Sequence, residues 1–178
     1  LTPKDSYENG ISVIYQELSV INELSIQENL FVGKLPMKKV GIASVVDYAE
    51  MNKKAKELLA KIGLKRDPKT FVEDISVSEK QQVEIAKALA ADSKVIVMDE
   101  PTTSLTETEV EHLFKVIRAL KEEGKGIVFI SHKLAEIKEI GDRVTVLKDG
   151  AYVGTRNVSD VTVDDLVTMM VGRKSGDQ

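Results

Sequence analysis

The sequence predicts an α/β fold with a mostly parallel sheet flanked by helices. Short β-branched runs alternate with longer segments in which apolar residues recur at helical spacing, a pattern typical of parallel strands joined by crossover helices. Residues 20–90 depart from this alternation because their patterns are mainly helical. We therefore predict two parts: an α/β core made of residues 1–20 and 91–178, and a helical subdomain made of residues 21–90.

Composition excludes several classes of protein. The 178 residues contain no apolar run near the roughly 20 residues that a membrane-spanning helix needs. The net charge of -4 argues against a nucleic-acid partner, because binding to phosphates requires a basic surface. There is no cysteine for a disulfide or thiolate metal site, and no signal-peptide pattern. We expect a cytoplasmic protein that reaches a membrane only through other proteins.

The first elements are a strand and a short helix. Residues 11–15 form a β-branched and aromatic run that predicts a buried strand, with Gln16 at its carboxyl end. Ser25 and Glu28 have the spacing of a capping box, which predicts a short helix after Ser25. Residues 37–46 are moderately apolar without a clear period, so we expect an irregular segment there.

Two longer helices complete the predicted subdomain. Asp47 and Glu50 have capping-box spacing at the start of the first, and Ser76 and Glu79 have it at the start of the second, which covers residues 75–89. The first has an apolar stripe of Met51, Ala55, Leu58, Leu59 and Ile62, followed by Gly63 as its stop. The second has a predicted buried face of Val83, Ala86, Leu89 and Ala90.

Strands and helices alternate after residue 94. The predicted elements are a strand at 95–98, a helix at 107–123 opened by Thr106 and Glu109, a strand at 126–131, a helix at 133–140, a hairpin at 143–154 with Asp149 and Gly150 in its turn, and a helix from Thr162 and Asp165 to Gly172. The order supports a mostly parallel sheet interrupted by a helical insertion.

Polar residues follow three of the predicted strands. They are Gln16, the pair Asp99 and Glu100, and the pair Ser131 and His132. Ligands of open α/β sheets bind at the carboxyl ends of strands. Four apolar residues followed by Asp-Glu form the pattern of a Walker B strand, in which the first acid holds Mg²⁺ and the second activates water. Taken alone, the two acids could equally cap the strand or the following turn.

The helix start at Ser76 is a candidate anion site. Its first-turn N–H groups and the positive end of the helix dipole would point outward at Ser76, Val77 and Ser78. An ordinary N-cap explains the same residues. A lone histidine such as His132 is likewise often a structural hydrogen-bonding residue.

The order of these features resembles a known family. Gln16, the Ser76 helix start in "ISVSEKQQVEIAKAL", the "VIVMDE" strand, "PTTSLT" and the strand ending at His132 are similar to the Q-loop, signature motif, Walker B motif, D-loop and H-loop of ABC transporter ATPases. The segments "VEIAKAL", "IVMDEPT", "GIVFISHK" and "MMVGRK" resemble the first ATPase half of galactose- or ribose-type sugar importers. The resemblance implies a P-loop NTPase-like fold with a partial RecA-like core.

The resemblance also implies a function and a role for each residue. The function is ATP hydrolysis that drives carbohydrate uptake, with transmembrane permease subunits and a second ATPase half as direct partners and a sugar-binding protein as an indirect one. The chain would lie on the inner face of the cell membrane through the permease. The implied roles are Mg²⁺ binding by Asp99 and Gln16, general base for Glu100, contact with the γ-phosphate for His132, water contact for Gln16, and contact with ATP of the opposite subunit for Ser76, Val77, Ser78 and Glu79.

The sequence departs from the family pattern at three points. The signature serine is followed by Val77, Ser78 and Glu79 where Gly-Gly-Gln is usual, so the acid would repel phosphate unless it turned back as a cap partner. The D-loop ends in Thr106, where many relatives carry Asp. No G-x-x-x-x-G-K-[ST] motif occurs, and we expect that the amino-terminal part with the phosphate-loop strand is missing.

The missing phosphate loop leads to two further expectations. The chain as given should bind ATP and Mg²⁺ weakly or not at all and should be inactive by itself. The strand at 127–130 should lie at a sheet edge, where it could pair with another chain by strand exchange. Two other functions stay open: an ABC-type ATPase outside transport, and a binding module that has no catalytic activity.

Overall fold

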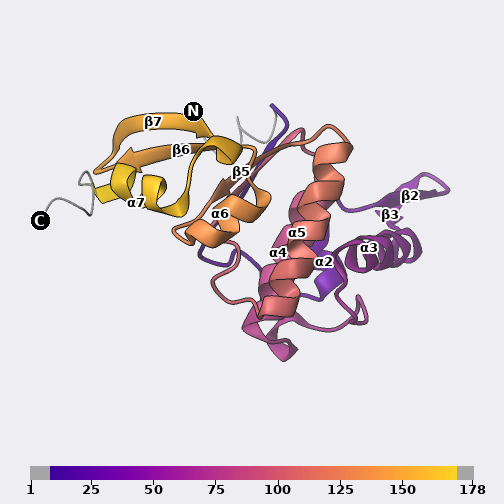
Figure 1. Cartoon of the computed structure of the whole chain (residues 1–178). Coiled ribbons are helices and arrows are strands. Elements are labelled where there is room, and N and C mark those ends of the chain that lie inside the picture. Colours follow the sequence, from indigo (N-terminus) through magenta and orange to yellow (C-terminus); the bar gives the residue numbers. More distant parts are fainter. Residues whose placement is uncertain (1–8, 172–178) are drawn as a thin grey trace, which may run out of the picture. The chain divides into compact units, whose positions relative to one another are not determined.

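The computed structural model describes residues 9–171, which fall into two compact units. Unit 1 ends at Ile130 and unit 2 begins at Ser131. Figure 1 shows the helices and strands of each unit, coloured along the chain.

Unit 1 contains a three-stranded parallel sheet. Its strands are β1 (Ile11–Ile14), β4 (Val95–Asp99) and β5 (Gly126–Ile130), in the order β1-β4-β5. Helix α4 (Val77–Ala90) packs against β1, and α5 (Glu107–Glu122) packs against β5. The predicted parallel α/β arrangement is therefore confirmed. Within the described residues β5 lies at the edge of the sheet, as expected.

The helices of unit 1 begin where the sequence predicted. They are α2 (Ile26–Leu30), α3 (Tyr48–Ile62), α4 and α5; the 3₁₀ turn η1 (Val72–Asp74), which lies before α4, was not predicted. Complete capping boxes precede α2, α4 and α5. The predicted box at α3 is only half formed: Asp47 accepts a hydrogen bond from the Glu50 amide, whereas the Glu50 carboxylate lies 3.4 Å from Lys54.

The expectation of an irregular segment at residues 37–46 was wrong. This segment is a hairpin of β2 (Met37–Val40) and β3 (Ala43–Val46), joined through Gly41 at a φ of 63°. A two-residue turn with positive φ suits a hairpin. All of β2 and most of β3 is exposed, so neither face is selected to be apolar, and the alternation that normally marks a strand is absent.

The core of unit 1 lies between its helices and its sheet. The predicted stripe of α3 is buried except for Leu58, which is half-buried. Phe114 of α5 meets Phe129 of β5 edge to face, with the ring centroids 6.0 Å apart. Helix α4 is buried around most of its circumference, including Gln81 and Glu84, whereas Leu89 and Ala90 are only half-buried. The predicted buried face of α4, a single apolar stripe, therefore included only part of the buried surface of this helix.

Unit 2 has its own small core. Its elements are α6 (Leu134–Ile140), β6 (Arg143–Lys148), β7 (Ala151–Asn157), η2 (Val158–Asp160) and α7 (Val163–Val171). The strands form the predicted hairpin, with Asp149 and Gly150 at positive φ in its turn. Its core consists of Val144, Val146, Val158, Val161 and Leu166. Thr162 and Asp165 cap α7 reciprocally as predicted, and the predicted end at Gly172 lies outside the described residues.

Substitution of Gly63 tests the packing between α3 and α5. It follows α3 at a φ of 75°, and a Cβ there would lie 2.5 Å from Nε2 of His112. We expect Gly63→Ala to lower the free energy of unfolding by about 2 kcal/mol, because left-handed backbone strain and steric overlap add. Urea denaturation measures this. Gly124, with a φ of 84° and nothing near its Cβ position, is the matched control.

Gly124→Ala has the backbone strain alone and should cost about 1 kcal/mol. The excess at Gly63 should disappear in a background of His112→Ala. Equal losses at both glycines would show that the imidazole of His112 does not constrain this position.

Candidate functional site

The carboxyl edge of the unit 1 sheet brings together three of the predicted site residues. In the register of β1 and β4, Ile14 lies beside Met98. Gln16 follows Ile14 by two residues, and Glu100 follows Met98 by two residues. Asp99 is the last residue of β4. Gln16 is exposed and both acids are half-buried, so this edge presents carboxylate and amide oxygens to a ligand.

The backbone at Glu100 has an unusual conformation. Its φ is 49°, in the left-handed region that residues other than glycine rarely adopt. Its amide donates to the carbonyl of Ile130 at 2.9 Å, and its carbonyl accepts from the Thr103 hydroxyl at 3.0 Å. These bonds hold the strained conformation and fix the direction in which the side chain leaves β4. Such strain concentrates at functional sites.

Alanine and glycine at position 100 separate this strain from side-chain contacts. Both substitutions remove the carboxylate, but only glycine adopts the observed φ without steric cost. We expect Glu100→Gly to be more stable than Glu100→Ala by about 1 kcal/mol. Chemical denaturation measures the difference, and the same pair at Glu111, an exposed position inside α5, should show the opposite order. Equal stabilities at position 100 would mean that the left-handed turn is absent in solution.

The second group of predicted residues forms the start of α4. Ser76 is the N-cap, and its hydroxyl accepts from the Glu79 amide at 3.3 Å. The hydroxyls of Ser76 and Ser78 are 3.1 Å apart, and Val77 is 58% exposed. The first-turn amides of a helix have no carbonyl partner inside it. This exposed start can therefore offer N–H and hydroxyl donors to an anion.

Glu79 is turned back onto the cap and away from a ligand position. Its carboxylate accepts from the Ser76 amide at 2.9 Å and from Nε of Arg66 at 2.6 Å. Hydrogen bonds from Arg66 hold the pKa of the Glu79 carboxyl below its usual value, and those from Ser76 act in the same direction. Sequence reasoning anticipated the cap but missed Arg66, because nothing in the spacing of residues 66 and 79 marks an ion pair.

The lowered pKa of Glu79 predicts a pH-dependent contribution to stability. Because its folded pKa lies below the usual 4.5, its contribution is present above pH 4.5 and is lost as the pH falls through the folded pKa. Glutamine keeps the capping geometry, so Glu79→Gln should cost roughly 0.5–1 kcal/mol at neutral pH and progressively less as the pH falls below 4.5. Urea denaturation over a series of pH values measures this.

Removal of Arg66, the main cause of the lowered pKa of Glu79, provides the control. In an Arg66→Ala background, Glu79→Gln should show a smaller pH dependence. A Glu79→Gln difference that persists at low pH would contradict the ionic role.

His132 belongs to unit 2. It is exposed and precedes α6, and the amide of the next residue, Lys133, donates to the Ser131 hydroxyl at 3.0 Å. The chain thus places Gln16, Asp99, Glu100 and the Ser76–Glu79 segment in unit 1 and His132 in unit 2.

The donors at the sheet edge suit Mg²⁺. Oxygen atoms from carboxylates and amides are its preferred protein ligands, and it commonly takes one or two carboxylates together with phosphates and water. Asp99 and Gln16 supply such oxygens. The described residues contain no cluster of three or more His, Cys, Asp or Glu side chains that could hold a metal ion by themselves.

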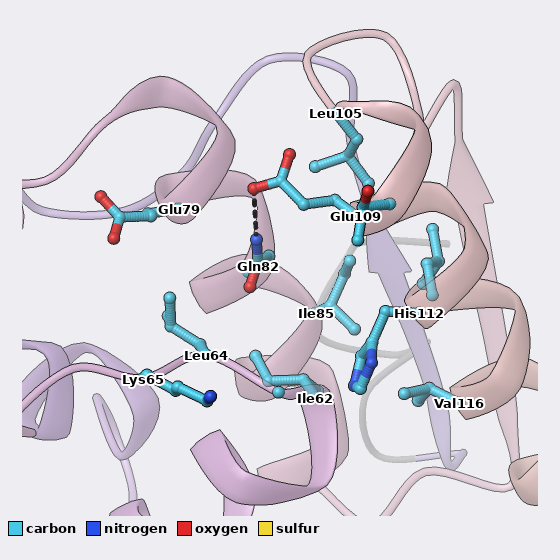
Figure 2. A pocket seen from close by; sticks show the side chains of 13 residues that line it. Ile62, Leu64, Lys65, Glu79, Gln82, Ile85, Leu105, Glu109, His112 and Val116 are labelled. Atoms are coloured by element: carbon cyan, nitrogen blue, oxygen red, sulfur yellow. Dashed lines mark hydrogen bonds between the residues drawn. The ribbon is translucent and has the colours of Figure 1, made fainter.

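A cavity of about 320 Å³ lies elsewhere in unit 1. Figure 2 shows its lining from the end of α3, from α4 and from α5, with Gln82 donating to Glu109 at 2.9 Å. Nε2 of His112 is buried there without a hydrogen-bond partner. Neither acid of the sheet edge lines this cavity, but Glu79 at the start of α4 does.

Comparison with known proteins places these features in a family. The model of the ABC transporter family matches residues 2–103. The galactose/methyl galactoside import ATP-binding protein of Clostridium tetani is 49% identical over 170 residues, which cover 96% of this chain and 34% of that protein. The D-allose import ATP-binding protein of Escherichia coli is 52% identical over 165 residues, covering 93% and 32%. The chain therefore spans about a third of the length of these relatives.

Solved structures show the same fold. The ADP conformation of MJ1267, an ATP-binding cassette of an ABC transporter, matches with a TM-score of 0.75 at 22% identity, covering 97% of this chain and 72% of that one. A dimeric cassette, MJ0796 bound to ADP and Pi, matches with a TM-score of 0.74 at 25% identity, covering 89% and 68%. Among residues 9–171, every helix is too short or too polar to cross a membrane. By its sequence and its fold, the chain belongs to the ABC transporter family.

Proposed function

We propose that this chain forms part of the ATP-hydrolysing subunit of a bacterial sugar importer. The observation that carries the proposal is the placement of Asp99 and Glu100 at the carboxyl end of β4, beside the end of β1 that leads to Gln16. The high identity to galactose and allose import proteins supports a carbohydrate as the transported substrate. ATP is the proposed substrate of the site, with Mg²⁺ as its cofactor.

Asp99 and Gln16 are the proposed Mg²⁺ ligands. Bound there, the ion would neutralise charge on the phosphates of ATP. Asp99 is fixed by its place at the end of a strand that is paired on both sides. Gln16 lies two residues beyond the end of β1 and is exposed, so it can respond to a neighbouring protein as well as to a nucleotide.

Glu100 is the proposed general base. Its backbone is held by Ile130 and Thr103, so the direction in which the side chain leaves the backbone is fixed before the substrate arrives. The carboxylate would accept a proton from the attacking water while that water bonds to the γ-phosphorus and the bond from the γ-phosphorus to the bridging oxygen of ADP breaks. Positioning of this kind supplies most of the catalysis in phosphoryl transfer. His132 is proposed to contact the γ-phosphate, as the order of the motifs implies.

The start of α4 is proposed to serve a second ATP-binding half. Ser76, Val77 and Ser78 present donors in an exposed first turn, and Glu79 is withdrawn into the cap. These groups would contact the γ-phosphate of ATP held by the opposite subunit, and the existence of a dimeric relative supports such a pairing. Permease subunits are the proposed direct membrane partners, a sugar-binding protein is an indirect one, and the proposed location is the cytoplasmic face of the membrane.

The chain as given is proposed to be a poor ATPase by itself. None of its 178 residues forms the glycine-rich phosphate-loop motif, and the main cradle for the nucleotide must come from elsewhere. The edge strand β5 also exposes Val128 and Ile130 at 47% and 46%. We propose that this edge is completed by pairing with a further strand, which in the isolated chain comes from a second copy by strand exchange.

A chimera tests the proposed function. This chain would replace the matching 165-residue segment of the Escherichia coli D-allose import ATP-binding protein. We expect the chimera to hydrolyse ATP and to support allose uptake with its permease, because the chain supplies the Asp99–Glu100 pair and the α4 start. Glu100→Gln should lower ATP hydrolysis by at least about a hundredfold, since it removes the base but keeps the side-chain size. Phosphate release and sugar uptake measure the outcome.

Two comparisons make the chimera decisive. Glu107→Gln, in the exposed first turn of α5, should leave both activities unchanged. A folded chimera that binds ATP without hydrolysing it would indicate a binding module. ATP hydrolysis without sugar uptake would indicate an ABC-type ATPase outside transport. Full activity of Glu100→Gln would contradict the assignment of the base.

A further inference from the structure

Glu84 is a buried carboxylate that the proposed chemistry does not use. It lies on α4 and is 5% exposed. A carboxylate is costly to bury unless it is hydrogen-bonded, so its partners indicate why this side chain occupies the interior.

The partner of Glu84 is Ser19, three residues after Gln16. Oε1 of Glu84 accepts from the Ser19 amide at 2.8 Å and from its hydroxyl at 2.9 Å, and Oε2 is 3.1 Å from the same hydroxyl. Nζ of Lys87 approaches the hydroxyl at 3.5 Å. A charged acceptor thus holds both the main chain and the side chain of one residue, which fixes that residue more firmly than a single contact could.

The same face of α4 makes a second contact with this segment. Nζ of Lys80 donates to the side-chain carbonyl of Asn22 at 2.9 Å. Residues 80, 84 and 87 follow helical spacing and lie on one face of α4. The residue before Asn22, Ile21, donates its amide to Oδ1 of Asn29 at 2.7 Å, and Asn29 is fully buried. Residues 19–22 are therefore fastened to α4 on one side and to α2 on the other.

These contacts join two parts of the candidate site. The fastened segment begins three residues after Gln16, and Glu84 lies on the helix that begins immediately after Ser76. A helix transmits displacement along its axis because its hydrogen bonds make it stiff. A shift of the segment after Gln16 would thus be passed to α4 and to the donors at its start.

We propose that Glu84 is a positioning residue that clasps Ser19 and makes Gln16 and the Ser76 helix start move as one body. The roles of Gln16 and Ser76 in this inference rest on the proposed function, whereas the clasp itself rests on the contacts of Glu84. The catalytic consequence is that loss of the clasp lowers the rate of ATP hydrolysis without weakening the binding of ATP.

Hydrogen exchange in the full chain tests the clasp directly. Glu84→Ala should accelerate exchange at the Ser19 amide by about tenfold or more, since that amide loses a charged acceptor. Glu84→Gln should restore most of the protection, because the bonds to the Ser19 amide and hydroxyl now share one oxygen, and an amide oxygen can accept both. Gln81→Ala is the control, because Gln81 is 4% exposed on the same helix and its Nε2 has no hydrogen-bond partner.

The control variant should change exchange at Ser19 only as much as exchange throughout α4. Unchanged protection of Ser19 in Glu84→Ala would overturn the proposal. So would acceleration that is equal at Ser19 and in α4, because it would reflect general destabilisation.

The chimera tests the catalytic consequence. Glu84→Ala should lower kcat for ATP by about tenfold with little change in KM; Ser19→Ala, which keeps the amide bond to Glu84, should lower it less, and the double variant should be no worse than Glu84→Ala alone. Glu84→Gln should recover activity. Losses that multiply in the double variant, or that appear only in KM, would overturn the positioning role. An inactive parent chimera would count against the proposed function, and hydrogen exchange at Ser19 would still decide the clasp.

Discussion

The pairing of β4 with both of its neighbours is the constraint on which the candidate site depends. Parallel bonds to β1 and β5 fix the level at which β4 ends, so Asp99 and Glu100 leave the sheet beside the end of β1. The bond from the Glu100 amide to Ile130 continues this pairing one residue beyond the strand. This bond to β5 holds the left-handed backbone at Glu100. Without β5 the bond would be lost, and the backbone could relax to an unstrained conformation.

The helical part of unit 1 is tied to this edge by polar contacts as well as by apolar packing. Helix α4 is buried on most sides, yet it carries Glu84 inward to meet Ser19. An apolar side chain at position 84 would leave the Ser19 amide without its acceptor. The sheet therefore determines where Asp99 and Glu100 lie. Helix α4 determines how the segment after Gln16 is held relative to the start of α4 at Ser76.

Local signals in the sequence were sufficient for much of this structure. Capping boxes act within one helical turn, so the starts of α2, α4, α5 and α7 could be read from residues three apart. The hairpin at residues 37–46 was missed because exposure on both faces removes the alternation that reports a strand. The contacts of Arg66 with Glu79 and of Ser19 with Glu84 join residues far apart in the chain, and no periodicity encodes such pairs.

Glu79 shows how a departure from a family pattern can be absorbed. An acid in the first turn of a phosphate-binding helix opposes the ligand, but it also favours the helix through the dipole and the cap. Arg66 resolves this conflict because its guanidinium is bonded to the carboxylate at 2.6 Å and carries the opposite charge. The pair is close to neutral as seen by an incoming anion. At the anion site proposed for the start of α4, the donors of Val77 and Ser78 would then act with the positive end of the helix dipole largely uncancelled, and Glu79 would cost that proposed site little of its attraction for phosphate.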